Sequence, residues 1–294
     1  MKQVLFEGAA TALITPFKNN KMDFSALDRL IEFQISSGIS ALVICGTTGE
    51  SATLDDDEHL SVIEYAVKRV NGRVPVVAGT GSNNTAHAIM MSKEAEAIGA
   101  DGLLLVTPYY NKTTQIGLVR HFNAIADSTS LPAIVYNVPS RTGVNILPET
   151  YKELAKHPNL AAIKEANGDL EALKKTISLV GDEFAVYSGN DDQIVPILKL
   201  GGKGVISVLS NVLPAETNTI CKAFFEGRIG EAEKMQEEYQ PLIKALFCEV
   251  NPIPVKAAMA LMGYSTPEIR LPLVEPEKEH LELIKAELKK AGAI

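Results

Sequence analysis

The chain has 294 residues, of which 46% are hydrophobic, so it can bury the core of one barrel-sized domain. Its net charge of −8 disfavours a nucleic-acid partner, which usually requires a basic face. The sequence shows no charged-then-apolar leader and no apolar run near the roughly 20 residues of a spanning helix, so we expect a cytoplasmic protein without membrane contact. Three widely spaced cysteines argue against a disulfide framework or a zinc cluster, and we interpret Cys45 as a small buried residue rather than a reactive thiol.

Short, mostly continuous apolar runs recur along the chain, as expected of parallel strands that are covered on both faces. The predicted strands are Ala10–Ile14, Ala41–Ile44, Val74–Ala78, Gly102–Val106, Ala133–Tyr136, Leu160–Lys164, Phe184–Ser188 and Gly204–Val208. Amphipathic segments lie between them, among them Phe24–Gly38, Glu58–Val70, Thr85–Gly99 and Leu170–Val180. An open doubly wound sheet could alternate in the same way, but so many evenly spaced units favour a closed (β/α)8 TIM barrel.

After Val208 the pattern changes to helices alone. The predicted helices are Pro214–Glu226, Ile229–Phe247, Ile253–Met262 and Glu277–Ala291. We therefore predict a catalytic barrel over residues 1–226, followed by a helical extension over residues 227–294 that packs on the barrel and is not a separate catalytic module.

Barrel enzymes carry their chemistry at the carboxyl ends of the strands, and Lys164 closes the sixth predicted strand. Burying an ammonium group lowers its pKa, and the resulting free amine is what a Schiff-base nucleophile needs. The alternative is a lysine that reaches out to the barrel mouth or pairs with Glu165. Neighbours on a strand point to opposite faces, which disfavours that pair.

Three other strand ends carry candidate groups, and each also has a purely structural interpretation. Tyr136 ends the preceding strand, where its phenol could transfer protons or simply cap the core. The segment Gly46-Thr47-Thr48-Gly49 could bind a carboxylate through hydroxyl and backbone N–H groups, or form a plain turn. Arg141 could hold a carboxylate in a bidentate pair, or lie solvated in a loop.

Metal and nucleotide sites are disfavoured. The acidic run that starts at Asp55 fits a helix start, with Asp55 as the N-cap, better than a metal site, because consecutive helix positions do not share a face. The five histidines are isolated, and the glycine-rich segments Gly79–Gly81 and Gly201–Gly204 are too short and misplaced for a dinucleotide fingerprint. We expect no metal and no cofactor.

Several segments together resemble the dihydrodipicolinate synthase family, within the superfamily of pyruvate-dependent class I aldolases and N-acetylneuraminate lyases. They are Gly46–Glu50, Thr107–Asn111, Tyr136–Gly143, Ile163–Glu165, Gly201–Ser207 and Asn251–Lys256. The resemblance runs from about Phe6 to the C-terminal helices. It implies a (β/α)8 lyase that condenses pyruvate with L-aspartate 4-semialdehyde to 4-hydroxy-tetrahydrodipicolinate, in the diaminopimelate and lysine pathway.

The resemblance also implies residue roles. Lys164 would form the Schiff base, while Tyr136 would move protons through Thr47 to Tyr110 of a neighbouring subunit. Thr48 would hold the pyruvate carboxylate and Arg141 the carboxylate of the aldehyde. Two further positions would line the pyruvate pocket, namely Gly189 and Ile206. The family is commonly a homotetramer built from two dimers, so we expect that assembly here.

Three alternatives remain at this stage. One is another pyruvate-dependent lyase, such as an N-acetylneuraminate or keto-deoxy-sugar-acid aldolase. Those enzymes share the lysine and the Tyr-Asn pair, but the neuraminate lyases usually have Ser-Thr in place of Thr47-Thr48 and lack the segment around Arg141. The others are a metal-dependent barrel lyase, which a chelator would inactivate, and a non-catalytic barrel that binds a keto acid without turnover.

Many relatives are inhibited by lysine at a subunit interface. The positions that match this site are Ser51, Ala52, Asp56, His59, Asn83, His87 and Tyr109. Lysine-sensitive relatives commonly have histidine in place of Asp56 and a glutamate, which pairs with the ligand's ammonium group, in place of His87. Because an imidazole removes that acceptor charge, we predict weak or absent inhibition by lysine. Asp56 could compensate only if its carboxylate reaches across from its own helix turn.

Overall fold

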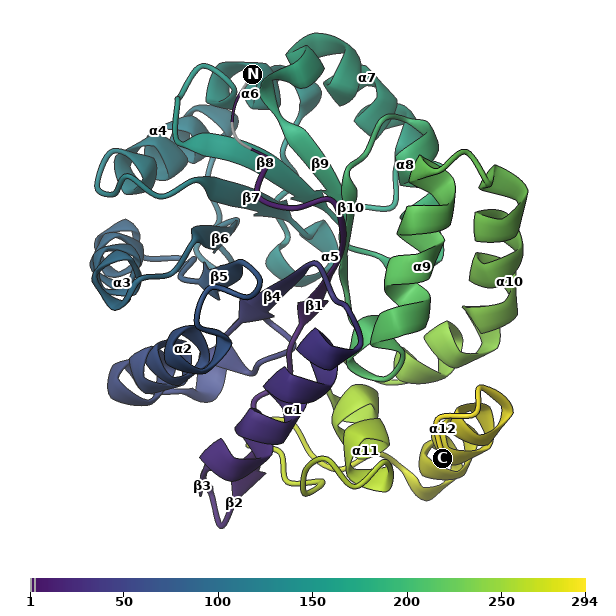
Figure 1. Ribbon diagram of the computed structural model, residues 1–294. Coiled ribbons are helices and arrows are strands. Elements are labelled where there is room, and N and C mark those ends of the chain that lie inside the picture. Colours follow the sequence, from purple (N-terminus) through teal and green to yellow (C-terminus); the bar gives the residue numbers. More distant parts are fainter. Residues whose placement is uncertain (1, 3) are drawn as a thin grey trace.

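A computed structural model describes residues 2 and 4–294, and it confirms the predicted closed barrel (Figure 1). Eight parallel strands close the barrel in the order β1-β10-β9-β8-β7-β6-β5-β4. Their bounds are β1 Gly8–Ala12, β4 Ala41–Ile44, β5 Val76–Gly79, β6 Gly102–Val106, β7 Ala133–Asn137, β8 Leu160–Glu165, β9 Ala185–Ser188 and β10 Gly204–Ser207. Figure 1 shows the strands meeting at the centre of a ring of helices.

The helices cover the outer face of the strands. Those of the ring are α1 Phe24–Ser36, α2 Asp56–Val70, α3 Thr85–Ile98, α4 Gln115–Ala126, α6 Pro148–Leu154, α7 Leu170–Val180, α8 Ile194–Lys199 and α9 Pro214–Phe225. One set of strand side chains packs against these helices, and the alternate set fills the barrel interior, as with Ile163 outside and Ala162 inside. The strands read as continuous apolar runs because both of their faces are buried.

The first strand lies two residues before the predicted range. Gly8 and Gly204 have φ values of +109° and +150°, and a Cβ on Gly204 would lie 1.8 Å from the Gly8 carbonyl oxygen. Only glycines permit this close backbone approach, so β1 begins at Gly8. The ladder ends early because the Asn211 side chain accepts the hydrogen bond of the Ile14 N–H at 3.1 Å.

A small hairpin was not predicted. It pairs β2, Phe17–Lys18, with β3, Lys21–Met22, in antiparallel register. The two turn residues, Asn19 and Asn20, have φ values of +54° and +58°. Asparagine tolerates this left-handed conformation in two-residue hairpin turns, so the Asn-Asn dipeptide was the available signal.

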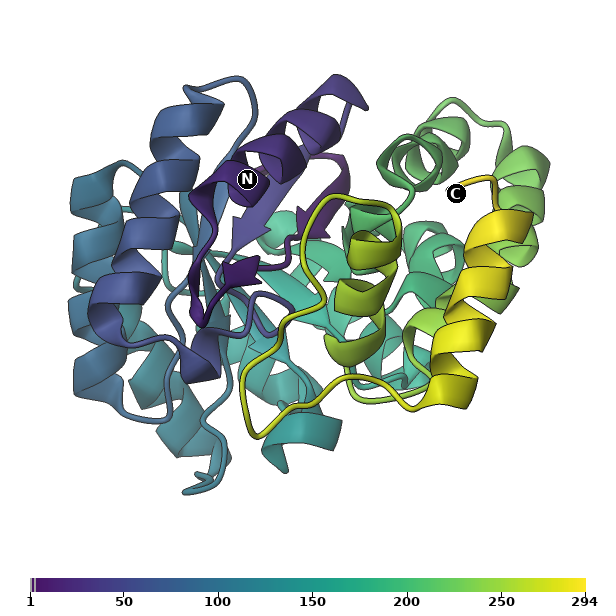
Figure 2. The same cartoon turned by 90° about the horizontal axis from the view of Figure 1, so that it is seen from below.

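The C-terminal extension consists of α10 Ile229–Leu246, α11 Ile253–Leu261 and α12 Lys278–Lys290, which agrees with the predicted helices within about a residue at each end. Helix α10 packs on α9, and α12 packs on both α10 and α11 (Figure 1). In the view of Figure 2, the segment between α11 and α12 makes a long loop beside α11 before the chain turns into α12. Within the described part of the chain, no helix is long and apolar enough to cross a membrane.

Candidate active site

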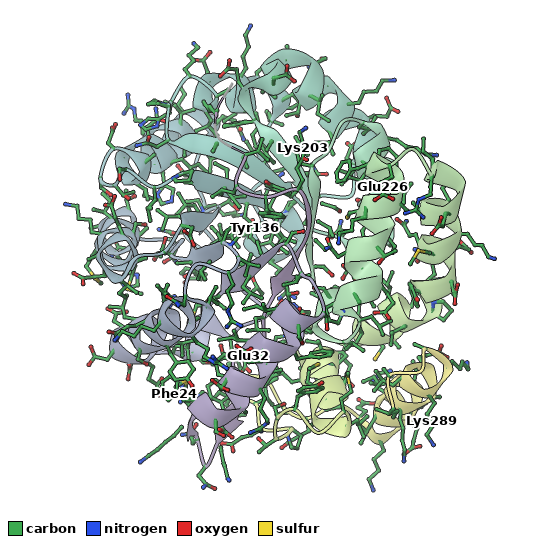
Figure 3. The ribbon with its side chains drawn as sticks, in the orientation of Figure 1. Phe24, Glu32, Tyr136, Lys203, Glu226 and Lys289 are labelled. Atoms are coloured by element: carbon green, nitrogen blue, oxygen red, sulfur yellow. The ribbon has the colours of Figure 1, made fainter. Side chains whose placement is uncertain are left out.

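Lys164 and Tyr136 lie side by side inside the barrel. They are register partners on the paired strands β8 and β7. The Lys164 Nζ lies 4.1 Å from the centre of the Tyr136 ring. Figure 3 shows Tyr136 near the centre of the ring of strands. The geometry therefore places an amine and a phenol together at the carboxyl ends of neighbouring strands.

The Lys164 amine lies in an environment that favours its neutral form. Its side chain is buried, and burial lowers the pKa of Lys164 to about 7. The Asp191 carboxylate opposes this shift in pKa, and the Arg141 charge adds to it. A buried amine with a pKa near neutrality can attack a carbonyl carbon without a separate base.

Glu165 points to the outer face of the barrel, as the strand alternation predicts. Its carboxylate accepts hydrogen bonds from the Asn137 side chain on β7, at 3.0 and 3.2 Å, and from the Tyr151 hydroxyl on α6, at 3.0 Å. Burial raises the pKa of Glu165 to about 7, although these hydrogen bonds oppose the rise. We did not predict a role for Glu165, because its partners come from segments that the sequence does not bring together.

Tyr136 is kept in its protonated form. Burial raises the pKa of Tyr136 to about 12, while the Arg141 charge and a hydrogen bond with the Thr47 side chain oppose the rise. Thr47 is one of the groups that act on the phenol, and its part in a proton relay stays a prediction. The neighbouring Thr48 is buried, and its hydroxyl accepts a hydrogen bond from the Asn251 side chain at 3.0 Å.

The C-terminal extension contacts the loop Gly46–Glu50 through Lys256 and Arg270. The Glu50 carboxylate pairs with the Lys256 ammonium on α11 at 2.5 Å, and both side chains are only 1% exposed. The same carboxylate accepts a hydrogen bond from the Arg270 N–H at 3.1 Å. The extension therefore supports the candidate site directly, a role that helix patterns alone did not predict.

Arg141 lies on a short helix, α5 Pro139–Thr142, and not in the solvated loop that was its structural alternative. The proline at its first turn presets a helical φ, and Gly143 ends the helix in a left-handed conformation. The Arg141 guanidinium donates to the Asn251 carbonyl oxygen at 3.0 Å. Asn251 thus contacts both Thr48 and Arg141, the two residues expected to bind substrate carboxylates.

The two residues expected at the pyruvate pocket lie at β9 and β10, the next two strands of the barrel after β8. Gly189 follows β9, and a Cβ at this position would lie 3.2 Å from Lys164 Cε and 2.8 Å from the Ala166 Cβ. Any larger residue there would crowd the lysine side chain. Ile206 on β10 is buried in the interior cluster that also contains Tyr136.

Tyr110 stands apart from the other candidates within one chain. Its side chain is 92% exposed, and its φ of +67° places it in the left-handed region, which is uncommon for a tyrosine. The neighbouring Tyr109 is 38% exposed. A single chain therefore does not bring Tyr110 to the buried pair of Tyr136 and Lys164.

A cavity of about 360 Å³ joins the outer part of this site to the positions that match the lysine site. Thr47, Arg141 and Asn251 line one part of it. The matching positions that line it are Ser51, Ala52, Asp56, His59, His87 and Tyr109. Asn83 lies beside them and donates to the Tyr109 carbonyl oxygen at 3.1 Å.

Asp56 reaches across to His87, with 2.9 Å between the Asp56 Oδ1 and the His87 Nε2. The Asp56 carboxylate therefore reaches the position where it could replace the missing glutamate. It is already paired with the His87 imidazole, however. The acidic run itself is a helix start, because Asp55 and Glu58 form a capping box at the first turn of α2. Within residues 2 and 4–294 we find no group of three or more potential metal ligands.

The fold and the site together define a class of protein: a (β/α)8 barrel with a buried lysine amine beside a phenol at its strand ends, an arrangement that suits Schiff-base chemistry on a carbonyl compound. Residues 5–291 match the model of the dihydrodipicolinate synthetase family. The chain therefore belongs to this family, as the sequence motifs predict.

Individual relatives cover nearly the whole chain. The chain is 55% identical to a 4-hydroxy-tetrahydrodipicolinate synthase of Caldicellulosiruptor bescii, over 97% of this chain and 96% of the relative. It is 44% identical to the crystal structure of a dihydrodipicolinate synthase from Thermotoga maritima, with a TM-score of 0.97 over 99% of this chain and 100% of that one. A monomeric dihydrodipicolinate synthase variant is also 44% identical, with a TM-score of 0.97 over 99% of this chain and 98% of that one.

Proposed function

We propose that the chain condenses pyruvate with L-aspartate 4-semialdehyde to give 4-hydroxy-tetrahydrodipicolinate. The observation that carries this proposal is the buried Lys164 amine, with a pKa of about 7, beside the Tyr136 phenol in a chain of this family. The alternative of a neuraminate or sugar-acid aldolase has weaker support, because the relatives at 50 to 55% identity carry the synthase name.

The residues fit the first half of this reaction. The Lys164 amine attacks the ketone carbon of pyruvate to form a carbinolamine, and loss of water gives the Schiff base. Tyr136 supplies the proton that leaves with the hydroxyl group, and Thr47 is its partner in the proposed proton relay. The Thr48 hydroxyl and the nearby backbone N–H groups bind the pyruvate carboxylate.

The second half needs a group for the aldehyde substrate. Loss of a methyl proton turns the Schiff base into an enamine, whose carbon attacks the aldehyde carbon and forms the new carbon–carbon bond. Arg141 lines the cavity and binds the carboxylate of L-aspartate 4-semialdehyde. The amino group of the aldehyde substrate then attacks the Schiff-base carbon, which forms the ring C–N bond, breaks the bond to Lys164 and releases the lysine amine and the cyclic product.

Turnover with defined substrates tests the activity. We expect consumption of pyruvate only when L-aspartate 4-semialdehyde is present, and no loss of rate in a metal chelator. Rapid cleavage of N-acetylneuraminate would instead identify the chain as a lyase of that type. Binding of pyruvate without turnover would identify a keto-acid-binding protein.

We also propose a cytoplasmic homotetramer built from two dimers, in which Tyr110 completes the site of its partner. The nearly complete exposure of the Tyr110 side chain supports this assembly, since an exposed tyrosine in a left-handed conformation is otherwise unfavourable. The monomeric relative provides the alternative, in which each chain works alone. Sedimentation of the purified protein at assay concentrations distinguishes the two.

Lysine is proposed to inhibit the enzyme weakly or not at all. The carboxylate of Asp56 is engaged with His87, so an incoming ammonium group would have to compete with the imidazole for it. Losing a charge-assisted contact of about 1.5–3 kcal/mol weakens binding about ten- to a hundredfold. A steady-state titration that shows strong inhibition below about 1 mM lysine would contradict this proposal.

A further inference from the structure

We propose that Glu165 is a positioning residue that holds Lys164 and Tyr136 in their reactive arrangement from the outer face of the barrel. This inference rests on the proposed Schiff-base function of Lys164. Glu165 does not touch the barrel interior, because its side chain points toward α6 and not toward the amine.

The carboxylate of Glu165 collects four donors from three segments. Besides Asn137 on β7 and Tyr151 on α6, it accepts the backbone N–H groups of Ala166 and Asn167, at 3.0 and 2.9 Å. All four donors are neutral groups. In its ionised form the carboxyl group suits this position better than an amide, because it then only accepts and has room for several donors on its two oxygens.

These contacts lie directly behind the reactive pair. Asn137 and Glu165 are register partners, as are their inward-pointing neighbours Tyr136 and Lys164. The hydrogen bonds between the Asn137 and Glu165 side chains therefore fix the ends of β7 and β8 relative to each other. Any slippage of one strand end would change the distance between the amine and the phenol on the opposite face.

The end of a third strand, β9, is linked to Glu165 by a backbone hydrogen bond. The Gly189 N–H after β9 donates to the Glu165 carbonyl oxygen at 2.7 Å. Gly189 is also the residue that closely approaches the Lys164 side chain. Glu165 thus organises three neighbouring strand ends, and each of them carries a residue expected to contact pyruvate or its proton relay.

A purely structural role would explain the burial of Glu165 equally well, so the test must separate positioning from stability. The Glu165→Gln variant keeps the size of the side chain but turns an amide toward the donors. We expect kcat to fall about ten- to a hundredfold, because small misplacement of reacting groups has effects of this size. The KM for pyruvate should change less than about threefold, and borohydride should still label Lys164, only more slowly.

The matched control is Glu149→Gln, the same chemical change at an exposed position on α6. It should leave kcat unchanged. A second variant, Asn137→Ala, removes the donor from the other strand, and it should give the same pattern of lowered kcat and nearly constant KM. This variant keeps the inference testable if Glu165→Gln does not fold.

Borohydride labelling and activity of the wild type distinguish a failure of this inference from a failure of the proposed function. If pyruvate and borohydride do not label the wild type, the proposed function fails. If the wild type is labelled and active, but both variants keep kcat within about twofold and lose only thermal stability, Glu165 is a structural residue and the inference is wrong.

Discussion

Lys164 is the residue on which the chemistry depends, and its lowered pKa gives a pH dependence of definite sign. The amine attacks only when it is unprotonated, so the rate of Schiff-base formation should rise with pH and level off above the pKa of about 7. The charged groups that face it, Asp191 and Arg141, act in opposite directions and leave burial as the dominant cause. Initial rates of borohydride trapping with pyruvate measure this profile.

An ordinary lysine would behave differently. If burial did not lower the pKa, the trapping rate would continue to rise toward the usual lysine value of 10.5. A profile of that kind would contradict the assignment of a buried reactive amine.

Arg141 should determine the affinity for the aldehyde substrate and not for pyruvate. Its guanidinium is anchored by the Asn251 carbonyl oxygen, but it is exposed in the single chain, so water screens part of its charge. We expect Arg141→Ala to weaken L-aspartate 4-semialdehyde binding by about 1.5 kcal/mol, or about tenfold, with a smaller effect on pyruvate. Steady-state KM values for both substrates measure this difference.

The control for this variant is Arg29→Ala, an exposed arginine on α1 that donates to groups within its own helix and to Tyr264. It should change neither KM. Equal effects of Arg141→Ala on the two substrates would refute the division of labour between Thr48 and Arg141.

At the scale of single residues, the sequence predicts functional residues where a polar side chain closes an otherwise apolar strand. Lys164 and Tyr136 are such residues, and the structure brings them together. Glu165 and Asn251 were not predicted as functional residues. Each acquires its role through partners far along the chain, as Asn251 does through Thr48 and Arg141, and no local pattern records such contacts.

At the scale of elements, the α11 segment of the extension supports the loop that carries Thr47 and Thr48. The buried pair of Glu50 and Lys256 joins the two, and burial lowers the pKa of Lys256 despite the attraction of Glu50. Removing one partner leaves the other charge buried and unpaired, so Lys256→Met should lower the free energy of unfolding by about 3–5 kcal/mol. Denaturant unfolding of the purified variant measures this loss.

The matched control is Lys290→Met on α12, whose ion pair with Glu287 leaves the lysine 71% exposed. This change should alter the free energy of unfolding by less than about 1 kcal/mol. Adding Glu50→Gln to Lys256→Met should recover part of the lost stability, because it removes the unpaired charge. Unchanged stability of Lys256→Met would show that the pair does not hold the extension in place.

Prediction of the elements succeeded where hydrophobic periodicity determines them, as for β4 and β6, whose bounds match the predicted ranges. It failed where glycine geometry or side-chain hydrogen bonds decide. β1 is displaced because Gly8 and Gly204 allow the backbones to approach and Asn211 ends the ladder. The hairpin at Phe17–Met22 was overlooked because its strands are only two residues long.

At the scale of the whole molecule, the exposed Tyr110 makes the assembly part of the proposed mechanism. Tyr110→Phe should slow the chemical step without abolishing pyruvate binding, because it removes one hydroxyl group from the proton relay. Mixed oligomers of Tyr110→Phe and Lys164→Ala chains should recover activity, since some sites then combine an intact lysine with an intact tyrosine from the partner. Absence of recovery in verified mixed oligomers would show that each chain is catalytically complete.

Schiff-base formation between Lys164 and pyruvate is tested most directly by covalent trapping. After incubation with pyruvate and borohydride, we predict one reduced pyruvate per chain, located by peptide mapping on the peptide that contains Lys164. Lys164→Ala should fold and remain unlabelled. A wild-type protein that stays unlabelled, or a label on any other residue, would contradict the account.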